Sequence, residues 1–214
     1  MDEDISIINK NTRNEKIKNF FINNKKSLIS TLIIFILILF GYFAYEEIQS
    51  RKKIELAEKY NQISNKFILN KSKNVINDLV QIINEKDTTY SPLALYFIID
   101  NELEASNEEI NKYFDILIND LRLEKEIKNL IIYKKGLFNS DFETENNLIS
   151  ILKPIINSES VWKSHALYLM AEFFIYKNQK QKAKEFYNKI LSDKNSNENL
   201  RKESRKRLSR DFSE

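Results

Sequence analysis

A single run of uncharged, mostly apolar residues constrains this chain more than any other feature. Residues 27–45 read SLISTLIIFILILFGYFAY and lie between Lys25-Lys26 and Glu46-Glu47. As a helix with a rise of about 1.5 Å per residue, the run is roughly 28 Å long, close to the ~30 Å hydrocarbon core of a bilayer. The sequence therefore predicts one transmembrane helix, which places the residues that follow it on one side of a membrane.

We interpret the run as an uncleaved anchor rather than a secretory signal. A signal has an apolar core of about 7–15 residues and small residues at its cleavage site. Here a tail, 1–26, precedes the run, and bulky aromatic residues occupy its exit. A buried core helix is a weaker alternative, because such a helix rarely lacks a polar face over this length. The side chains expected to face lipid or its interface include Leu28, Ile33, Phe35, Leu37, Phe40, Tyr42 and Tyr45.

The basic residues near the run predict its orientation. Those before it are Lys10, Arg13, Lys16, Lys18, Lys25 and Lys26, and those after it are Arg51, Lys52, Lys53 and Lys59. Because flanks rich in Lys and Arg stay in the cytoplasm, we expect a cytoplasmic N-terminus and a C-terminal domain outside the cytoplasm. The tail is polar apart from Ile17, Phe20 and Phe21, and it fits either a disordered segment or a short interfacial helix.

Composition limits both the fold class and the chemistry. The 214 residues include 2 Gly and 2 Pro, too few for the many turns of an all-β fold. The net charge of +3 gives no strong basic field for nucleic acid. The chain has no Cys and one His, His165, which cannot supply a standard zinc site. Phosphate-binding and hydrolase motifs are missing, so we expect a non-enzymatic protein with no cofactor and no small-molecule substrate.

Apolar residues recur at helical spacing through the rest of the sequence. Leu56, Tyr60, Ile63 and Phe67 share one helical face, which predicts a stalk helix, 46–70, that continues the anchor. Helix starts near 91, 123 and 161 are spaced as in two-helix solenoid repeats. The further helices are expected around 75–83, 93–103, 110–121, 127–138, 142–152, 161–176, 183–191 and 197–212.

Polar residues predict where several of these helices begin and end. Ser106 and Glu109 have the spacing of a capping box. Ser91, followed by Pro92, is expected to cap its helix, and Asp141 is expected to cap another. Either Ser158 or Ser160 can cap the helix over 161–176, while Pro154 should kink or end the helix that contains it.

The segment 166–195, ALYLMAEFFIYKNQKQKAKEFYNKILSDKN, resembles a tetratricopeptide repeat. Small residues at Ala171 and Ala183 would let the paired helices approach closely. Asn178 stands where the motif usually has Gly at its turn, and Asn195 stands where it usually has Pro. The predicted packing residues are Trp162, Leu167, Met170, Ala171, Phe174, Ala183, Tyr187 and Ile190.

The whole architecture is similar to the YfgM-type, membrane-anchored tetratricopeptide-like proteins of bacteria. The likeness rests on the basic tail, the anchor, the order L-x-P-I-I at 152–156, Val161-Trp162, the repeat and Asn199-Leu200-Arg201. It implies an all-α fold, in which a single N-terminal transmembrane helix precedes a tetratricopeptide-like helical-hairpin solenoid over 71–214. It also implies a bacterial inner-membrane protein with a periplasmic domain, ancillary to the Sec translocon.

The resemblance implies protein partners, namely translocon subunits, periplasmic chaperones or newly exported clients. A scaffold that coordinates cell division or envelope assembly is the alternative function. The densest charge cluster, in the last predicted helix, contains Arg201, Arg205, Lys206 and Arg207. It fits a solvated face partly paired with Glu198, Glu203 and Asp211, or a patch that contacts anionic lipid or an acidic partner.

Overall fold

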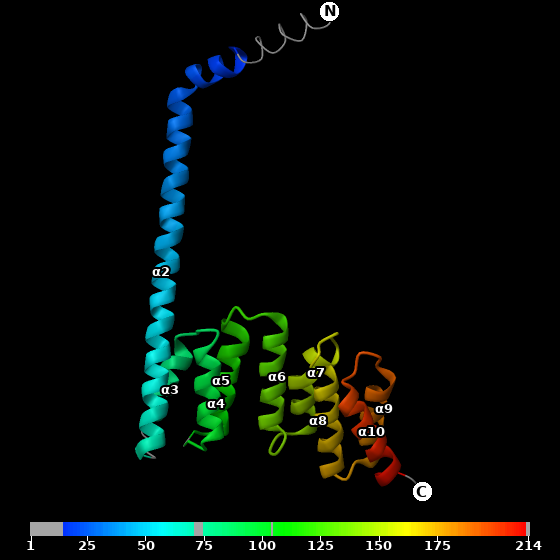
Figure 1. Ribbon diagram of the computed structural model, residues 1–214. Coiled ribbons are helices and arrows are strands. Elements are labelled where there is room, and N and C mark those ends of the chain that lie inside the picture. Colours follow the sequence, from blue (N-terminus) through cyan, green and yellow to red (C-terminus); the bar gives the residue numbers. More distant parts are fainter. Residues whose placement is uncertain (1–14, 71–74, 104, 213–214) are drawn as a thin grey trace, which may run out of the picture. The chain divides into compact units, whose positions relative to one another are not determined.

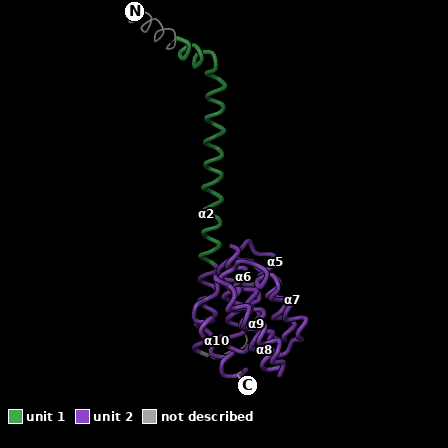
Figure 2. The backbone as a smooth tube through the Cα atoms, turned by 90° about the vertical axis from the view of Figure 1, so that its right-hand side faces the viewer, with its two compact units in different colours: residues 1–55 green, residues 56–214 purple. Residues whose placement is uncertain are grey.

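The computed structural model describes residues 15–70, 75–103 and 105–212, which form helices and turns but no strand. A helical stretch at 15–23 ends in a turn at Asn24, and α2 then runs from Lys25 to Asn70. The chain divides into two compact units, Met1–Glu55 and Leu56–Glu214, so the boundary falls within α2 (Figure 2). The described part of the tail is thus helical, as one of the two interpretations of the sequence expected.

The second unit is a succession of helices that lie side by side in the order of the chain (Figure 1). Each helix from α3 to α10 packs against the next one, and α3 also contacts α5, α6 contacts α8, and α8 contacts α10. Packing between helices one or two positions apart in the chain is typical of a solenoid, and the described residues confirm the predicted all-α fold. The helices are α3 Ile76–Asn84, α4 Tyr90–Asp100, α5 Asn107–Asp120, α6 Lys125–Asn139, α7 Glu145–Ile156, α8 Lys163–Tyr176, α9 Lys180–Ser192 and α10 Glu198–Asp211.

Two hydrophobic clusters form the interior of this unit. The first joins the C-terminal part of α2 to α3, α4, α5 and α6, and the second joins α6, α7, α8 and α9. The adjacent residues Ile131 and Ile132 of α6 belong to different clusters, and both are buried. Helix α6 therefore contributes one face to each cluster and connects the two halves of the solenoid.

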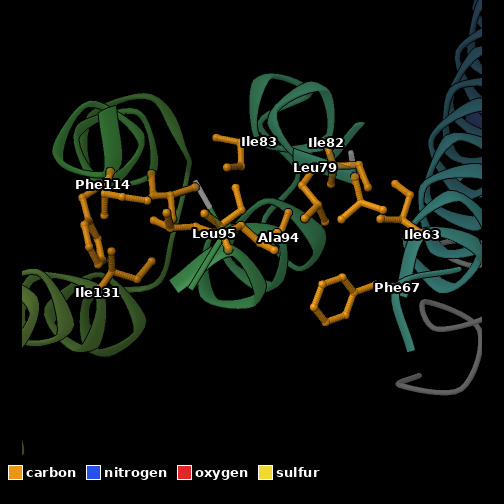
Figure 3. Close-up of a cluster of buried hydrophobic side chains, with 14 of the residues drawn as sticks. Ile63, Phe67, Leu79, Ile82, Ile83, Ala94, Leu95, Phe114 and Ile131 are labelled. Carbon is orange, nitrogen blue, oxygen red and sulfur yellow. The ribbon is translucent and has the colours of Figure 1, made fainter. Parts of the chain in front are cut away.

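The repeat unit begins earlier than the predicted boundary at residue 71. Ile63 and Phe67 of α2 are only 5% and 8% exposed, and Figure 3 shows them pointing toward Leu79, Ile82 and Ala94. The helical face expected for a stalk is therefore part of the first core, and the compact unit starts at Leu56. The turn expected at 70–72 falls largely on residues outside the described part of the chain.

Local capping follows the sequence at some helix ends and departs from it at others. The capping box of Ser106 and Glu109 is confirmed at the start of α5. The predicted cap at Ser91 is wrong, because its buried hydroxyl donates to the carbonyl of Ile82 at 2.8 Å. Asp87 acts in its place, since its carboxylate accepts the backbone N–H groups of residues 89 and 90 just before α4.

Two further helix ends concern α7 and α8. The cap of α7 is Thr144, whose hydroxyl accepts the N–H of Asn147, and not Asp141 as predicted. Pro154 lies in the last turn of α7, which ends two residues later, in agreement with its expected effect. Ser160 accepts the N–H of Trp162 at 3.1 Å, one residue before α8 begins.

Candidate functional site

The predicted lipid-facing residues all lie on α2. Leu28 is half-buried, and Ile33, Phe35, Leu37, Phe40, Tyr42 and Tyr45 are between 52% and 70% exposed. Among the described residues, α2 is the one helix long and apolar enough to cross a membrane, although a signal sequence near the N-terminus would meet the same criteria. An exposed apolar surface of this length is larger than the apolar patches that soluble monomers usually carry.

The predicted packing residues of the repeat meet in the interior of the α8–α9 hairpin. Trp162 is half-buried, and its ring stacks on that of Tyr133 with the centroids 5.7 Å apart. The other predicted residues, Leu167, Met170, Ala171, Phe174, Ala183, Tyr187 and Ile190, are at most 2% exposed. These side chains hold the fold together and are not available to a partner.

A partly buried polar cluster of Tyr187, Glu172 and Arg207 joins α8, α9 and α10. The hydroxyl of the fully buried Tyr187 donates to one carboxylate oxygen of Glu172, and Arg207 Nη2 donates to the other at 2.7 Å. Burial, together with the hydrogen bond to the Glu172 carboxylate, raises the pKa of Tyr187. The cluster therefore fixes the last helix onto the repeat through the Tyr187 hydroxyl, the Glu172 side chain and the Arg207 guanidinium.

The predicted basic patch separates into internal and exposed residues. Arg201 Nη2 donates to the carbonyl of Asp193 at 2.6 Å, and Arg207 belongs to the polar cluster with Tyr187 and Glu172. Arg205 and Lys206 are exposed, and Lys206 lies 3.7 Å from the Glu203 carboxylate. The structure thus gives Arg201 and Arg207 structural roles, and the surface available to an acidic partner is smaller than the sequence indicated.

Gly136, in α6, is a structural residue that the sequence analysis missed. It is buried, and a Cβ atom added there would lie only 2.4 Å from Leu152 Cδ2 on α7. It precedes Ala171 by 35 residues, and Leu152 precedes Tyr187 by the same interval. The position of Gly136, one repeat before the predicted small residue Ala171, could have indicated from the sequence that α6 and α7 approach closely.

Two neighbouring hollows border the α6–α7 hairpin, and Phe142 lines both. The polar hollow, of about 500 Å³, lies over α5, α6 and α7, while the aromatic hollow, of about 320 Å³, lies over α4, α5 and α6. The polar hollow is lined by Asn107, Glu108, Asn111, Lys135, Phe142, Glu143, Asn147, Ser150 and Ile151. The aromatic hollow is lined by Tyr96, Ile99, Asp100, Phe114, Lys134, Leu137, Phe138, Asp141 and Phe142.

Some side chains that line the polar hollow already have a polar partner, and others are exposed to solvent. Asn111 and Asn139 exchange two amide hydrogen bonds of 2.9 and 2.8 Å across α5 and α6, so this pair is already satisfied. Lys135 is held by Asp115 at 2.7 Å. Asn107 and Ser150 lie on the rim and are exposed. An amide and a hydroxyl in this position can hydrogen-bond to the backbone of an extended peptide.

The aromatic hollow combines an apolar wall with a charged rim. The ring centroids of Phe114 and Phe138 are 6.0 Å apart, and those of Phe138 and Phe142 are 5.3 Å apart. Leu137 is 50% exposed, so an apolar side chain from a partner can be buried here. Lys134 Nζ lies 4.0 Å from the ring centroid of Tyr96, whose pKa is raised to about 12, mainly by burial.

Comparisons with known proteins find a similarity over part of the chain. Residues 18–112 match the family model of a tetratricopeptide repeat-like domain, and no curated protein and no solved structure matches the chain. The matched part contains the apolar run, α2, α3, α4 and the start of α5. It ends well before 166–195, where the residues themselves resemble the repeat. Domains of this type are in general protein-interaction modules rather than enzymes.

Proposed function

We propose that this chain is a membrane-anchored interaction module that binds proteins and has no catalytic activity of its own. The observation that carries the proposal is that α2 holds both an exposed apolar run and, from Leu56 onward, a buried face of the first repeat core. The tetratricopeptide repeat-like match spans both parts of this helix. The domain type supports protein partners, and the apolar run supports attachment to a bilayer.

The finer assignment is an ancillary subunit of a bacterial translocon that assists exported proteins or periplasmic chaperones. The resemblance to the YfgM-type proteins motivates it, together with the basic residues on the N-terminal side of the run. In this proposal the N-terminus lies in the cytoplasm of a bacterial cell and the repeats lie in the periplasm, attached to the inner membrane.

Binding would be passive and would use the two hollows at the α6–α7 hairpin. The rim of the polar hollow is suited to a peptide backbone, and the aromatic hollow is suited to one large apolar side chain. An exported chain that has not yet folded exposes both kinds of group. The anchor raises the local concentration of these hollows near emerging clients without any added contact.

Site-specific photocrosslinking in living cells tests the proposal. A photoreactive residue in place of Leu137, in the aromatic hollow, should crosslink to translocon subunits, chaperones or exported chains. The matched control is Lys184, which is exposed on α9 and lines neither hollow. Crosslinks to division or envelope-assembly proteins would replace the translocon role with the scaffold role. Equal crosslinking from both positions would contradict binding at the hollows.

A further inference from the structure

We propose that the helical stretch 15–23 and its junction with α2 form a binding site for anionic phospholipids. The inference rests on the proposed membrane anchor and adds a ligand to it. Residues 15–23 are helical, and the apolar residues Ile17, Phe20, Phe21 and Ile22 are between 48% and 60% exposed. An apolar face immediately before a membrane-length run is at the depth of a bilayer surface, so lipid is the medium that covers it.

The stretch has the sidedness of a helix that lies in a membrane interface. At about 100° per residue, Ile17, Phe20 and Phe21 fall within an arc of about 100°. Asn19 lies on the opposite side of the helix, with Ile22 beside it, and Asn23 lies at one edge of the arc. The rings of Phe20 and Phe21 contact each other edge-on, with their centroids 5.9 Å apart. One side of the stretch can therefore enter the acyl region while the amide side stays in water.

The charges of this segment select anionic rather than neutral lipid. Lys16 and Lys18 flank the apolar arc, and Lys25 and Lys26 begin α2. Glu15 is the one acidic residue in the described part of the chain up to residue 45. None of the four lysines forms an ion pair with another described residue. Four free amines beside one carboxylate complement a surface of phosphate headgroups.

A hollow at the junction gives this surface a defined shape. It has a volume of about 460 Å³ and is lined by Phe21, Ile22, Lys25, Leu28, Ile29 and Leu32. Its walls are apolar apart from the amine of Lys25, so it is suited to the upper part of an acyl chain with the phosphate near that amine. The turn beside it, visible in Figure 1, is held because Asn24 donates to the carbonyl of Phe20 through both its backbone N–H and its side-chain amide.

The absence of Cys from the chain allows a direct test with single spin labels. The full chain would carry Phe20→Cys on the apolar arc, Asn19→Cys on the opposite side, or Leu37→Cys within the run. Each variant is reconstituted in vesicles of phosphatidylcholine with or without phosphatidylglycerol, and the accessibility of the nitroxide to oxygen and to a water-soluble nickel chelate is measured. In phosphatidylglycerol vesicles the label at Phe20 should favour oxygen, and the label at Asn19 should favour the chelate.

The three positions separate failure of the inference from failure of the anchor. If the label at Leu37 lies in lipid while the labels at Phe20 and Asn19 are equally exposed to water, the lipid site is wrong and the anchor stands. If the label at Leu37 is itself exposed to the chelate, the anchor is wrong. If Phe20 is shielded equally in both kinds of vesicle, the preference for anionic lipid is contradicted.

A pair of charge variants tests the headgroup contact separately. The double variant Lys16→Gln with Lys18→Gln leaves Lys25-Lys26 at the membrane edge, so the residues that set orientation remain. It should lower the phosphatidylglycerol retained by the purified protein about fivefold for each lysine removed, as measured by native mass spectrometry. The matched control, Lys52→Gln with Lys53→Gln beyond the run, should leave it unchanged. Equal retention by both double variants would overturn the proposal.

Discussion

The α6–α7 and α8–α9 hairpins are successive copies of one unit, yet they fill their interiors differently. In α8–α9, small residues are buried on both helices, at Ala171 and Ala183, and Tyr187 is buried in the same core cluster. In α6–α7, the residue 35 positions before Ala183 is the buried Leu148, and Gly136 takes the place of Ala171. The larger side chain of Leu148 on α7 is offset by the missing side chain of Gly136 on α6. Cores tolerate such changes when the total side-chain volume is kept.

The two hairpins also differ in polar structure. Tyr187 carries a hydroxyl that joins Glu172 and Arg207, while its counterpart Leu152 is purely apolar. The hairpin with the recognisable motif is therefore held together internally and fixed to α10. The hairpin without the motif borders both hollows. In α8–α9, the residues that match the repeat motif pack in the interior of the hairpin. The candidate binding surface lies at α6–α7, where the sequence matches the motif poorly.

The largest expected effect concerns Gly136 and Leu152. Leu152→Ala should lower the free energy of unfolding by about 2–5 kcal/mol, because it removes a fully buried side chain. Gly136→Ala alone should cost about 1–3 kcal/mol, since the new methyl group overlaps Leu152. The double variant should recover part of that loss. Urea unfolding of the full chain in detergent, followed through the fluorescence of Trp162, measures the stability of the three variants. If the costs of the two single changes simply add in the double variant, the contact between positions 136 and 152 is contradicted.

The next effect tests the small residues of the second hairpin. Ala171→Leu and Ala183→Leu should each cost about 1–3 kcal/mol, because both positions are fully buried and the added atoms overpack the helices. Lys184→Leu, one residue away on the exposed side of α9, is the control and should have little effect. A negligible change at both alanines would mean that α8 and α9 do not approach closely there.

A smaller effect should follow from removing the hydroxyl of Tyr187. Tyr187→Phe keeps the buried ring but leaves Glu172 with one partner fewer, and it should cost about 1–2 kcal/mol. Tyr176→Phe, which alters an exposed ring at the end of α8, serves as the control. If the two variants are equally stable in urea, the hydrogen bond to Glu172 does not stabilise the hairpin.

The smallest effect is expected at Asp193 and depends on pH. The N–H of Asn195 and the amine of Lys163 hold the pKa of Asp193 below its ordinary value. Its contribution is therefore present above that ordinary pKa and is lost as the pH falls through the lowered pKa. Asp193→Asn should cost about 0.5–1 kcal/mol at neutral pH, and the difference from the unchanged chain should vanish in acid. A difference that is constant with pH would contradict the ion pair.

Sequence patterns predicted the features that depend on neighbours along the chain. Helical periodicity placed the helices, and the capping box at Ser106 needed only a residue three positions away. The choice of Asn at position 178 agrees with its left-handed φ of 57° at the end of α8. Each of these features is decided within one or two helical turns, where spacing alone carries the information.

Features that depend on distant parts of the chain could not be predicted in this way. The hydroxyl of Ser91 donates a hydrogen bond to the carbonyl of Ile82, nine residues earlier, instead of capping its helix. Arg207 looked like one of several surface bases, but it binds a carboxylate 35 residues away. The hollows draw their walls from three helices each, and the boundary at Leu56 depends on the packing of α2 against α3 and α4. Tertiary contacts decided all of these.

Labelling from outside the cell tests the membrane anchor and its orientation most directly. Because the chain has no Cys, single variants Asn19→Cys and Glu185→Cys place one thiol on each side of the run, both at exposed positions. A membrane-impermeant maleimide added to intact bacterial spheroplasts should label the chain at position 185, and it should label position 19 only after permeabilisation. The reverse pattern would contradict the orientation. Recovery of the protein in the soluble fraction, with both thiols labelled only after lysis, would contradict the membrane anchor itself.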